Sequence, residues 1–91
     1  MSYAVLFTPK SMTVTKYEEV LKQLDKAGQG KPVGRLYHTS FGDHNQLRVF
    51  DVWDSMQSFE RFGETLMPIL KKNGVDPGQP DVREIHKVIK G

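Results

Sequence analysis

The sequence predicts an α+β fold in which two helices cover one face of a four-stranded antiparallel sheet. Four short runs rich in apolar, β-branched or aromatic residues are typical of strands, at residues 3–8, 35–41, 47–53 and 82–89. Two further stretches repeat apolar side chains every three or four residues, as amphipathic helices do. The element order is therefore β-α-β-β-α-β, and two right-handed crossovers give the strand order 4-1-3-2.

The first strand, residues 3–8, has apolar side chains on both faces and ends before Pro9, which cannot donate a ladder hydrogen bond. Thr13 or Thr15 can cap the helix that follows, and Gly28 is a typical helix end. The apolar stripe of this helix is Val14, Tyr17, Val20, Leu21, Leu24 and Ala27. A helix with one such stripe is expected to lie on the sheet.

The second and third strands are expected to form a hairpin, because only turn residues, 42–45, separate them. A five-residue turn would place Tyr37 opposite Asp51, whereas a shift of one residue would place His38 there. The second strand is the less apolar of the two, which is typical of a sheet edge. The third is apolar on both faces, like the first, so both are expected at the centre of the sheet.

Asp54 or Ser55 can cap the second helix, whose end is predicted at Gly74. Its apolar stripe is Phe59, Phe62, Leu66, Ile69 and Leu70. Pro68 lies inside this pattern, and a kink or a broken turn is expected there because proline has no amide hydrogen. The last strand, residues 82–89, mixes charged and apolar side chains on both faces, which is typical of an edge.

Composition narrows the class of protein. The 91 residues are expected to form a single domain, 1–91, and 37% hydrophobic content is ordinary for a globular chain. No apolar run has the length of a membrane span, and no signal-peptide pattern is found. The absence of cysteine fits a cytoplasmic protein. With a net charge of only +2, nucleic-acid binding is not expected.

The two inner strands also predict a partner. Their apolar side chains point to both faces, but the helices can cover only one face of the sheet. Burying several hundred Å² of the other face from each of two copies, at about 25 cal/mol per Å², would contribute many kcal/mol before association costs. The sequence therefore predicts a homodimer in which two sheets pack face to face.

Several short segments resemble one family. They are Gly34-Arg35-Leu36-Tyr37-His38, Val52-Trp53-Asp54-Ser55, Phe59 to Phe62, Leu66 with Pro68, Gly74-Val75 and Glu84-Ile85-His86-Lys87-Val88. The chain resembles the dimeric α+β barrel proteins related to the antibiotic biosynthesis monooxygenase domain, and most closely small uncharacterised bacterial ones. The resemblance implies a ferredoxin-like protomer, a homodimer and a cavity between sheet and helices. In relatives such cavities hold polycyclic aromatic substrates, lactones or haem.

The chain departs from the haem-degrading relatives of this family. These use an asparagine on the first strand, a tryptophan in the second helix and a histidine about three turns later. The first strand here has no asparagine, Phe62 stands at the tryptophan position, and the second helix has no histidine. Haem oxygenation is therefore not expected, and no cofactor is predicted.

Asp51 and His38 are the candidate catalytic residues. Asp51 lies between Phe50 and Val52 in an inner strand, where an ionised carboxylate must be paired. It can be a general base or orient a ligand, or it can be a structural group that binds an arginine, a tyrosine hydroxyl or an interfacial amide. An Asp-His pair is a plausible acid-base couple, although a lone strand histidine is more often structural.

Candidate ligand-binding residues are Tyr37, Arg48, Trp53, Phe62 and His86. Aromatic rings can stack on a planar ligand, and Arg48 or Arg35 can bind an acidic ligand or lie over apolar surface. Packing beneath the second helix is the more ordinary role for Trp53. The histidines are too far apart in sequence for a metal-ligand spacing, so no metal is predicted.

The sequence thus predicts that the protein binds a small apolar or aromatic molecule in a cavity between sheet and helices. One alternative is a non-catalytic dimerisation module with a filled core. Another is a cofactor-independent monooxygenase or isomerase that uses Asp51 and His38. A pocket of about 300 Å³ or more beside these two residues would favour ligand chemistry, and a filled core would favour the module.

Overall fold

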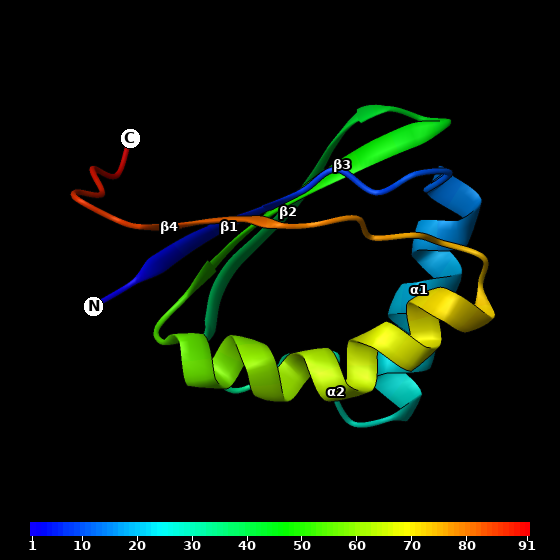
Figure 1. Ribbon diagram of the computed structural model, residues 1–91, viewed down its shortest axis with the longest axis horizontal. Coiled ribbons are helices and arrows are strands. Elements are labelled where there is room, and N and C mark those ends of the chain that lie inside the picture. The colour runs from blue at the N-terminus through cyan, green and yellow to red at the C-terminus, as the bar shows by residue number, and fades with distance from the viewer.

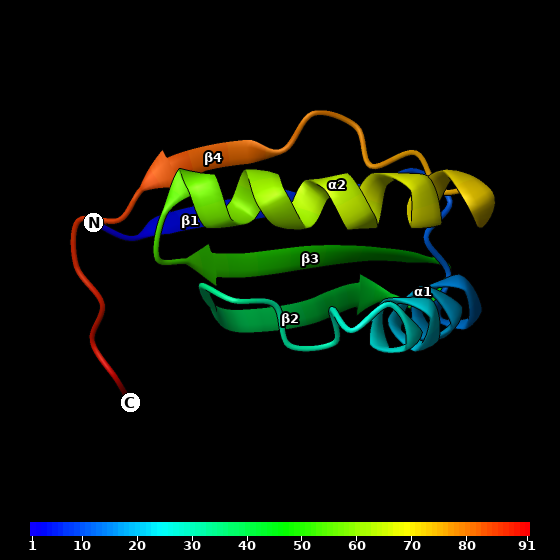
Figure 2. The same cartoon turned by 90° about the horizontal axis from the view of Figure 1, so that it is seen from below.

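The computed structural model describes residues 1–91 and contains the predicted elements in the predicted order. They are β1 (Tyr3–Phe7), α1 (Val14–Lys26), β2 (Arg35–Asp43), β3 (Gln46–Trp53), α2 (Met56–Lys72) and β4 (Asp81–Glu84). All strand pairs are antiparallel, and the sheet order β2-β3-β1-β4 confirms the sequence prediction. Figure 1 shows both helices on one side of the sheet, and Figure 2 shows the four strands side by side behind them.

Side-chain oxygens cap both helices. The Thr13 hydroxyl accepts from the amide of Lys16 at 3.1 Å, and the Ser55 hydroxyl accepts from the amide of Ser58 at 3.1 Å. Thr13 and Ser55, rather than Thr15 and Asp54, are thus the caps. Each satisfies one amide that has no partner within its helix.

Of the two outcomes expected at Pro68, the broken turn is not found, because α2 continues past this residue to Lys72. Figure 1 shows the helix changing direction in its second half, as a kink would produce. Pro68 removes the hydrogen bond to the carbonyl of Glu64. Both residues are exposed, so water can satisfy that carbonyl and the helix can continue. Asn73 then caps the end, and Gly74 adopts a positive φ of 70°.

The hairpin turn is shorter than predicted. Asp43 pairs with Gln46, so only His44 and Asn45 lie between the strands, and the ladder takes in residues that were expected in the turn. A bulge between Arg35 and Tyr37 shifts the register at the start of β2. Beyond the bulge, His38 is opposite Asp51, so the second of the two possible registers is the one observed.

The last strand is also shorter than predicted, and residues 85–89 do not continue it. The reason is that β1 begins at Tyr3, which pairs with Glu84, so little backbone is left for β4 to follow. One hydrogen bond, from the amide of Ile85 to the carbonyl of Ser2 at 2.9 Å, extends the contact. Figure 2 shows the C-terminal segment leaving the sheet at this end.

The core lies between the sheet and the helices. Val5 and Trp53 are fully buried on the inner face of the two central strands, and both helices contribute to the same cluster. The alternate residues of the sheet form its outer face, which no element covers. Its exposed large side chains, which we call the outer apolar patch, are Leu36, Tyr37, Phe41 and Phe50.

Candidate functional site

A cavity of about 50 Å³ lies between the inner face of the sheet and both helices. Ten of its 15 lining residues are hydrophobic, so any molecule inside it must be largely apolar. The polar groups on its wall are the hydroxyl of Tyr17, which is one of these ten, and the side chains of Arg35, His38 and Asp51. The volume is below the 300 Å³ or more that would by itself indicate a ligand pocket.

Three of these polar side chains form a continuous chain of hydrogen bonds. Asp51 Oδ1 lies 2.6 Å from His38 Nδ1, and His38 Nε2 lies 2.7 Å from the Tyr17 hydroxyl. The second carboxylate oxygen of Asp51 accepts from the indole Nε1 of Trp53 at 3.3 Å. Asp51 is only 3% exposed, so these contacts replace the hydration that its carboxylate would have in water.

When Asp51 is ionised and His38 is neutral, the chemistry of the donors sets the direction of these hydrogen bonds. A carboxylate only accepts hydrogen bonds, so His38 Nδ1 carries the proton and donates to Asp51. Its Nε2 is then the acceptor and receives the hydroxyl proton of Tyr17. The Tyr17 oxygen therefore offers lone pairs, and no proton, to a molecule in the cavity. In this protonation state the three side chains have the geometry to accept a hydrogen bond from a donor in the cavity.

Local structure explains why these side chains meet. Asp51 and Trp53 are two residues apart on β3 and so point to the same face, toward the helices. The short hairpin turn then brings His38 of β2 opposite Asp51. Tyr17 lies in the first turn of α1, after the Thr13 cap, on the stripe that faces the sheet.

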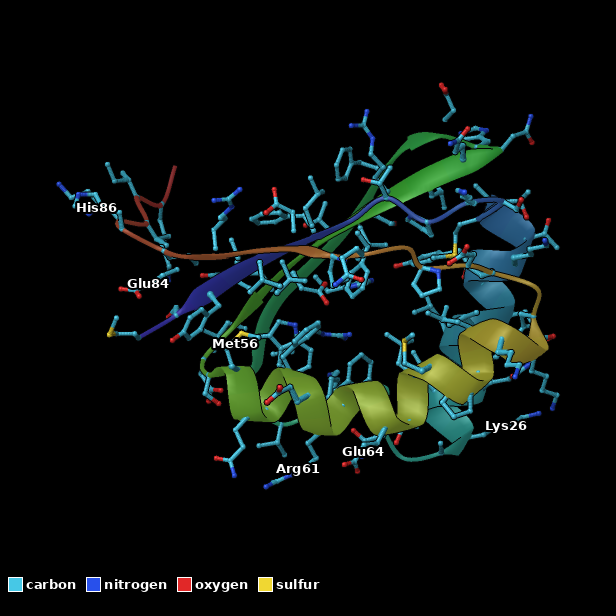
Figure 3. The ribbon with its side chains drawn as sticks, in the orientation of Figure 1. Lys26, Met56, Arg61, Glu64, Glu84 and His86 are labelled. Carbon is cyan, nitrogen blue, oxygen red and sulfur yellow. The ribbon has the colours of Figure 1, made fainter.

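The other predicted ligand-binding residues lie in several places. Phe62 lines the cavity, and Trp53 packs against its ring at a centroid distance of 5.3 Å. Tyr37 belongs to the outer apolar patch, and Arg48 lies over the Phe41 ring at 5.3 Å, so neither lines the cavity. His86 is exposed in the C-terminal segment, far from the helices in Figure 3.

Sequence reasoning did not select Tyr17 or Arg35 as site residues. Tyr17 was interpreted as one member of an apolar stripe, although a buried tyrosine hydroxyl usually needs a partner. This need for a hydrogen-bond partner is the feature of the sequence that could have identified Tyr17 as a site residue. Arg35 was considered only as one of two arginines for an acidic ligand. The bulge that follows Arg35 on β2, together with its position on the cavity wall, was visible only in the structure.

The structure contains no group of three or more side chains arranged to hold a metal ion. No helix combines the length and hydrophobicity that crossing a bilayer requires.

Comparison with solved structures identifies proteins that share this fold. SnoaB, a cofactor-independent oxygenase from Streptomyces nogalater, matches with a TM-score of 0.64 and 14% identity over 99% of this chain and 96% of its own. A candidate antibiotic biosynthesis monooxygenase from Chloroflexus aurantiacus matches with a TM-score of 0.67 and 12% identity, over 99% and 98%. A third, from Deinococcus radiodurans, has a TM-score of 0.62 and 13% identity, over 99% and 97%.

The sequence itself matches no protein-family model, and it matches no curated protein. At the low identities of the structural matches, the likeness concerns the arrangement of the backbone over nearly the full length of each chain. The chain therefore has the ferredoxin-like α+β fold of the antibiotic biosynthesis monooxygenase-like proteins, as its sequence predicted.

Proposed function

We propose that this protein binds a small apolar molecule that carries a hydrogen-bond donor, and that it accepts a proton from that donor through Tyr17, His38 and Asp51. The observation that carries the proposal is the hydrogen-bonded chain from Asp51 through His38 to Tyr17, on the wall of an apolar cavity. A ligand with an acidic O–H would donate to the Tyr17 oxygen, at the end of the hydrogen-bonded series farthest from the Asp51 carboxylate.

Proton transfer along these three side chains conserves protons and charge. The ligand gives its proton to the Tyr17 oxygen while the Tyr17 proton moves to His38 Nε2. The products are a deprotonated ligand and an imidazolium, which the Asp51 carboxylate stabilises at 2.6 Å. Deprotonation of this kind can begin either oxygenation without a cofactor or isomerisation. SnoaB, which shares the fold, is a cofactor-independent oxygenase.

The second candidate function is a non-catalytic dimerisation module, and the cavity volume favours it. About 50 Å³ is far below the range of pockets for drug-sized ligands. On this hypothesis the chain from Asp51 to Tyr17 is a structural device that satisfies buried polar groups. The two functions differ in whether a small donor molecule enters the cavity.

Phenol is a suitable probe, because it is mostly apolar and carries one acidic O–H; side chains on the wall of the 50 Å³ cavity would have to move to admit its ring. We expect phenol to shift the NMR signals of Tyr17 and His38, and the two imidazole ¹⁵N shifts of His38 to move toward the imidazolium pattern. Tyr17→Phe removes only the hydroxyl and should weaken binding by about tenfold. Tyr37→Phe, the same change on the outer face, should have no effect. If millimolar phenol shifts neither residue, the module is the better description.

We also propose that the outer apolar patch joins two copies of the chain face to face. Leu36 and Tyr37 are 52% and 49% exposed, and Phe41 and Phe50 are 39% and 38% exposed. They lie close together because Phe41 and Phe50 belong to the hairpin strands β2 and β3. A patch of this kind on a sheet is unusual for a monomer. Dimerisation would give the protein the dimeric α+β barrel form that its sequence resembles.

A further inference from the structure

Arg35 is a cation without a counterion on the wall of an apolar cavity. Its side chain is half-buried, and its guanidinium donates one hydrogen bond, to the carbonyl of Gly30 at 3.2 Å. The ion pairs of the structure, His38 with Asp51 and Arg83 with Asp81, do not include it. A guanidinium has five N–H donors in a planar fork, so most of the binding capacity of Arg35 remains unused.

Arg35 and the Tyr17 hydroxyl lie on different parts of the same cavity wall. Arg35 precedes His38 by three residues on β2, and the bulge lies between them. Three residues of extended strand span at most about 10 Å. The backbone at these two residues is therefore separated by no more than about the length of one aromatic ring with a polar substituent at each end. The wall of one cavity therefore carries both a guanidinium and the Tyr17 hydroxyl, on residues of different elements.

Phe62 lines this cavity and also a second one. The second cavity has a volume of about 80 Å³, lies beneath the 29–33 loop and the start of α2, and shares Phe62 with the first. Engineered apolar cavities that hold a benzene ring measure about 150 Å³, so neither cavity alone has that volume. Their combined volume approaches it, so a ligand with one aromatic ring would require the shared Phe62 ring to move. The Arg35 Cζ atom lies 5.8 Å from the centroid of that ring.

We propose that the ligand of this site is a small aromatic carboxylate that carries a hydroxyl group at the opposite end of its ring. The carboxylate would pair with the Arg35 guanidinium, the ring would displace Phe62, and the hydroxyl would donate to Tyr17. This inference rests on the proposed function, because it specifies the class of ligand for the same cavity. It assigns to Arg35 the role of selecting an anion.

The test compares two ligands that differ only in the anion. 4-Hydroxybenzoate has the carboxylate, and 4-hydroxybenzyl alcohol replaces it with a neutral group. Binding to the purified wild-type protein is measured by NMR titration. We expect the carboxylate to bind about tenfold or more tightly than the alcohol, since hydrogen bonds to charged partners are the stronger ones. We also expect the Phe62 ring signals to shift on binding.

Two variants that each lose one positive charge show whether the preference for the carboxylate depends on Arg35. Arg35→Gln should abolish the preference for the carboxylate, whereas Arg48→Gln, on the outer face over Phe41, should retain it. Arg35→Lys keeps the charge but loses the planar fork, so it should retain part of the preference. The wild-type comparison needs no variant, so the proposal is still tested if Arg35→Gln does not fold.

The outcomes separate this inference from the proposed function. If wild type binds both ligands equally, or if Arg35→Gln keeps the preference, the anion site is wrong and the proton-accepting cavity remains. In that case Arg35 serves only to hold the 29–33 loop and the Phe62 ring. If neither ligand nor phenol binds to wild type, both proposals fail together.

Discussion

At the scale of single residues, Asp51 shows how a sheet can hold a buried carboxylate. Its two oxygens accept from His38 and Trp53, and both donors are themselves fixed by packing against α1 and α2. No buried side-chain nitrogen or oxygen in the structure is without a partner. The arrangement therefore offsets the penalty of burying the Asp51 carboxylate.

Replacing Asp51 with alanine should destabilise the protein, because it leaves His38 Nδ1 and Trp53 Nε1 without their acceptor. Each such loss in a buried site costs about 1–3 kcal/mol. In a domain of this size, each kcal/mol lowers the melting temperature by about 4–8 °C. Thermal unfolding followed by circular dichroism measures the effect. Asp43→Ala, at an exposed position, is the control, and an unchanged melting temperature for Asp51→Ala would show that the carboxylate has no structural role.

The candidate residues predicted from the sequence were partly brought together. An apolar strand with one acidic residue was enough to indicate Asp51, and the hairpin limited its partner to His38 or Tyr37. The choice between these two depended on turn length and on the bulge after Arg35, which the sequence does not specify. Whether each residue acts in a reaction stays a prediction.

At the scale of elements, the close contact between the residue before β2 and the N-terminus of α2 depends on a glycine. Gly34 has a φ of 90°, and its carbonyl accepts from the amide of Asp54 at 2.8 Å. A Cβ atom at this position would lie 2.5 Å from Ser58 Cβ and 2.6 Å from Asp54 Oδ1. This close approach holds the N-terminus of α2 against the start of β2, and so helps to position Phe62 and Arg35.

Gly34→Ala should therefore lower the free energy of unfolding by about 2 kcal/mol or more, from the positive φ and from the steric conflict. Gly63→Ala is the matched control within α2. A Cβ at Gly63 would meet nothing within 4 Å, and alanine favours a helix by about 1 kcal/mol over glycine, so this variant should be more stable than wild type. Urea denaturation of both variants checks the prediction, and equal stabilities would contradict it.

At the scale of the whole molecule, the outer apolar patch predicts assembly. Phe50→Glu places a charge at the centre of the proposed interface, where it would have to lose its hydration without a partner. We expect this variant to be monomeric and wild type to be dimeric at micromolar concentration, as measured by light scattering after gel filtration. Met67→Glu, at an exposed position on α2, should stay dimeric. A monomeric wild type would contradict the proposed dimer.

The sequence by itself determined the element order, the strand order, the two apolar helix stripes and the presence of a buried carboxylate. These features depend on local periodicity, capping residues and chain connectivity, which a single chain displays directly. The same information was insufficient at the ends of elements. Strand β4 stopped at Glu84 because its partner β1 begins at Tyr3, which is a property of the pair.

Only the tertiary structure decided which polar groups meet. Tyr17 and Arg35 come from α1 and from the start of β2, and they reach the cavity of Asp51 through the packing of the helix and the bulge of the strand. Contacts between residues far apart in sequence depend on register and packing distances of a few ångströms. Periodicity fixes which face of an element is buried, but it does not fix which side chains lie opposite each other.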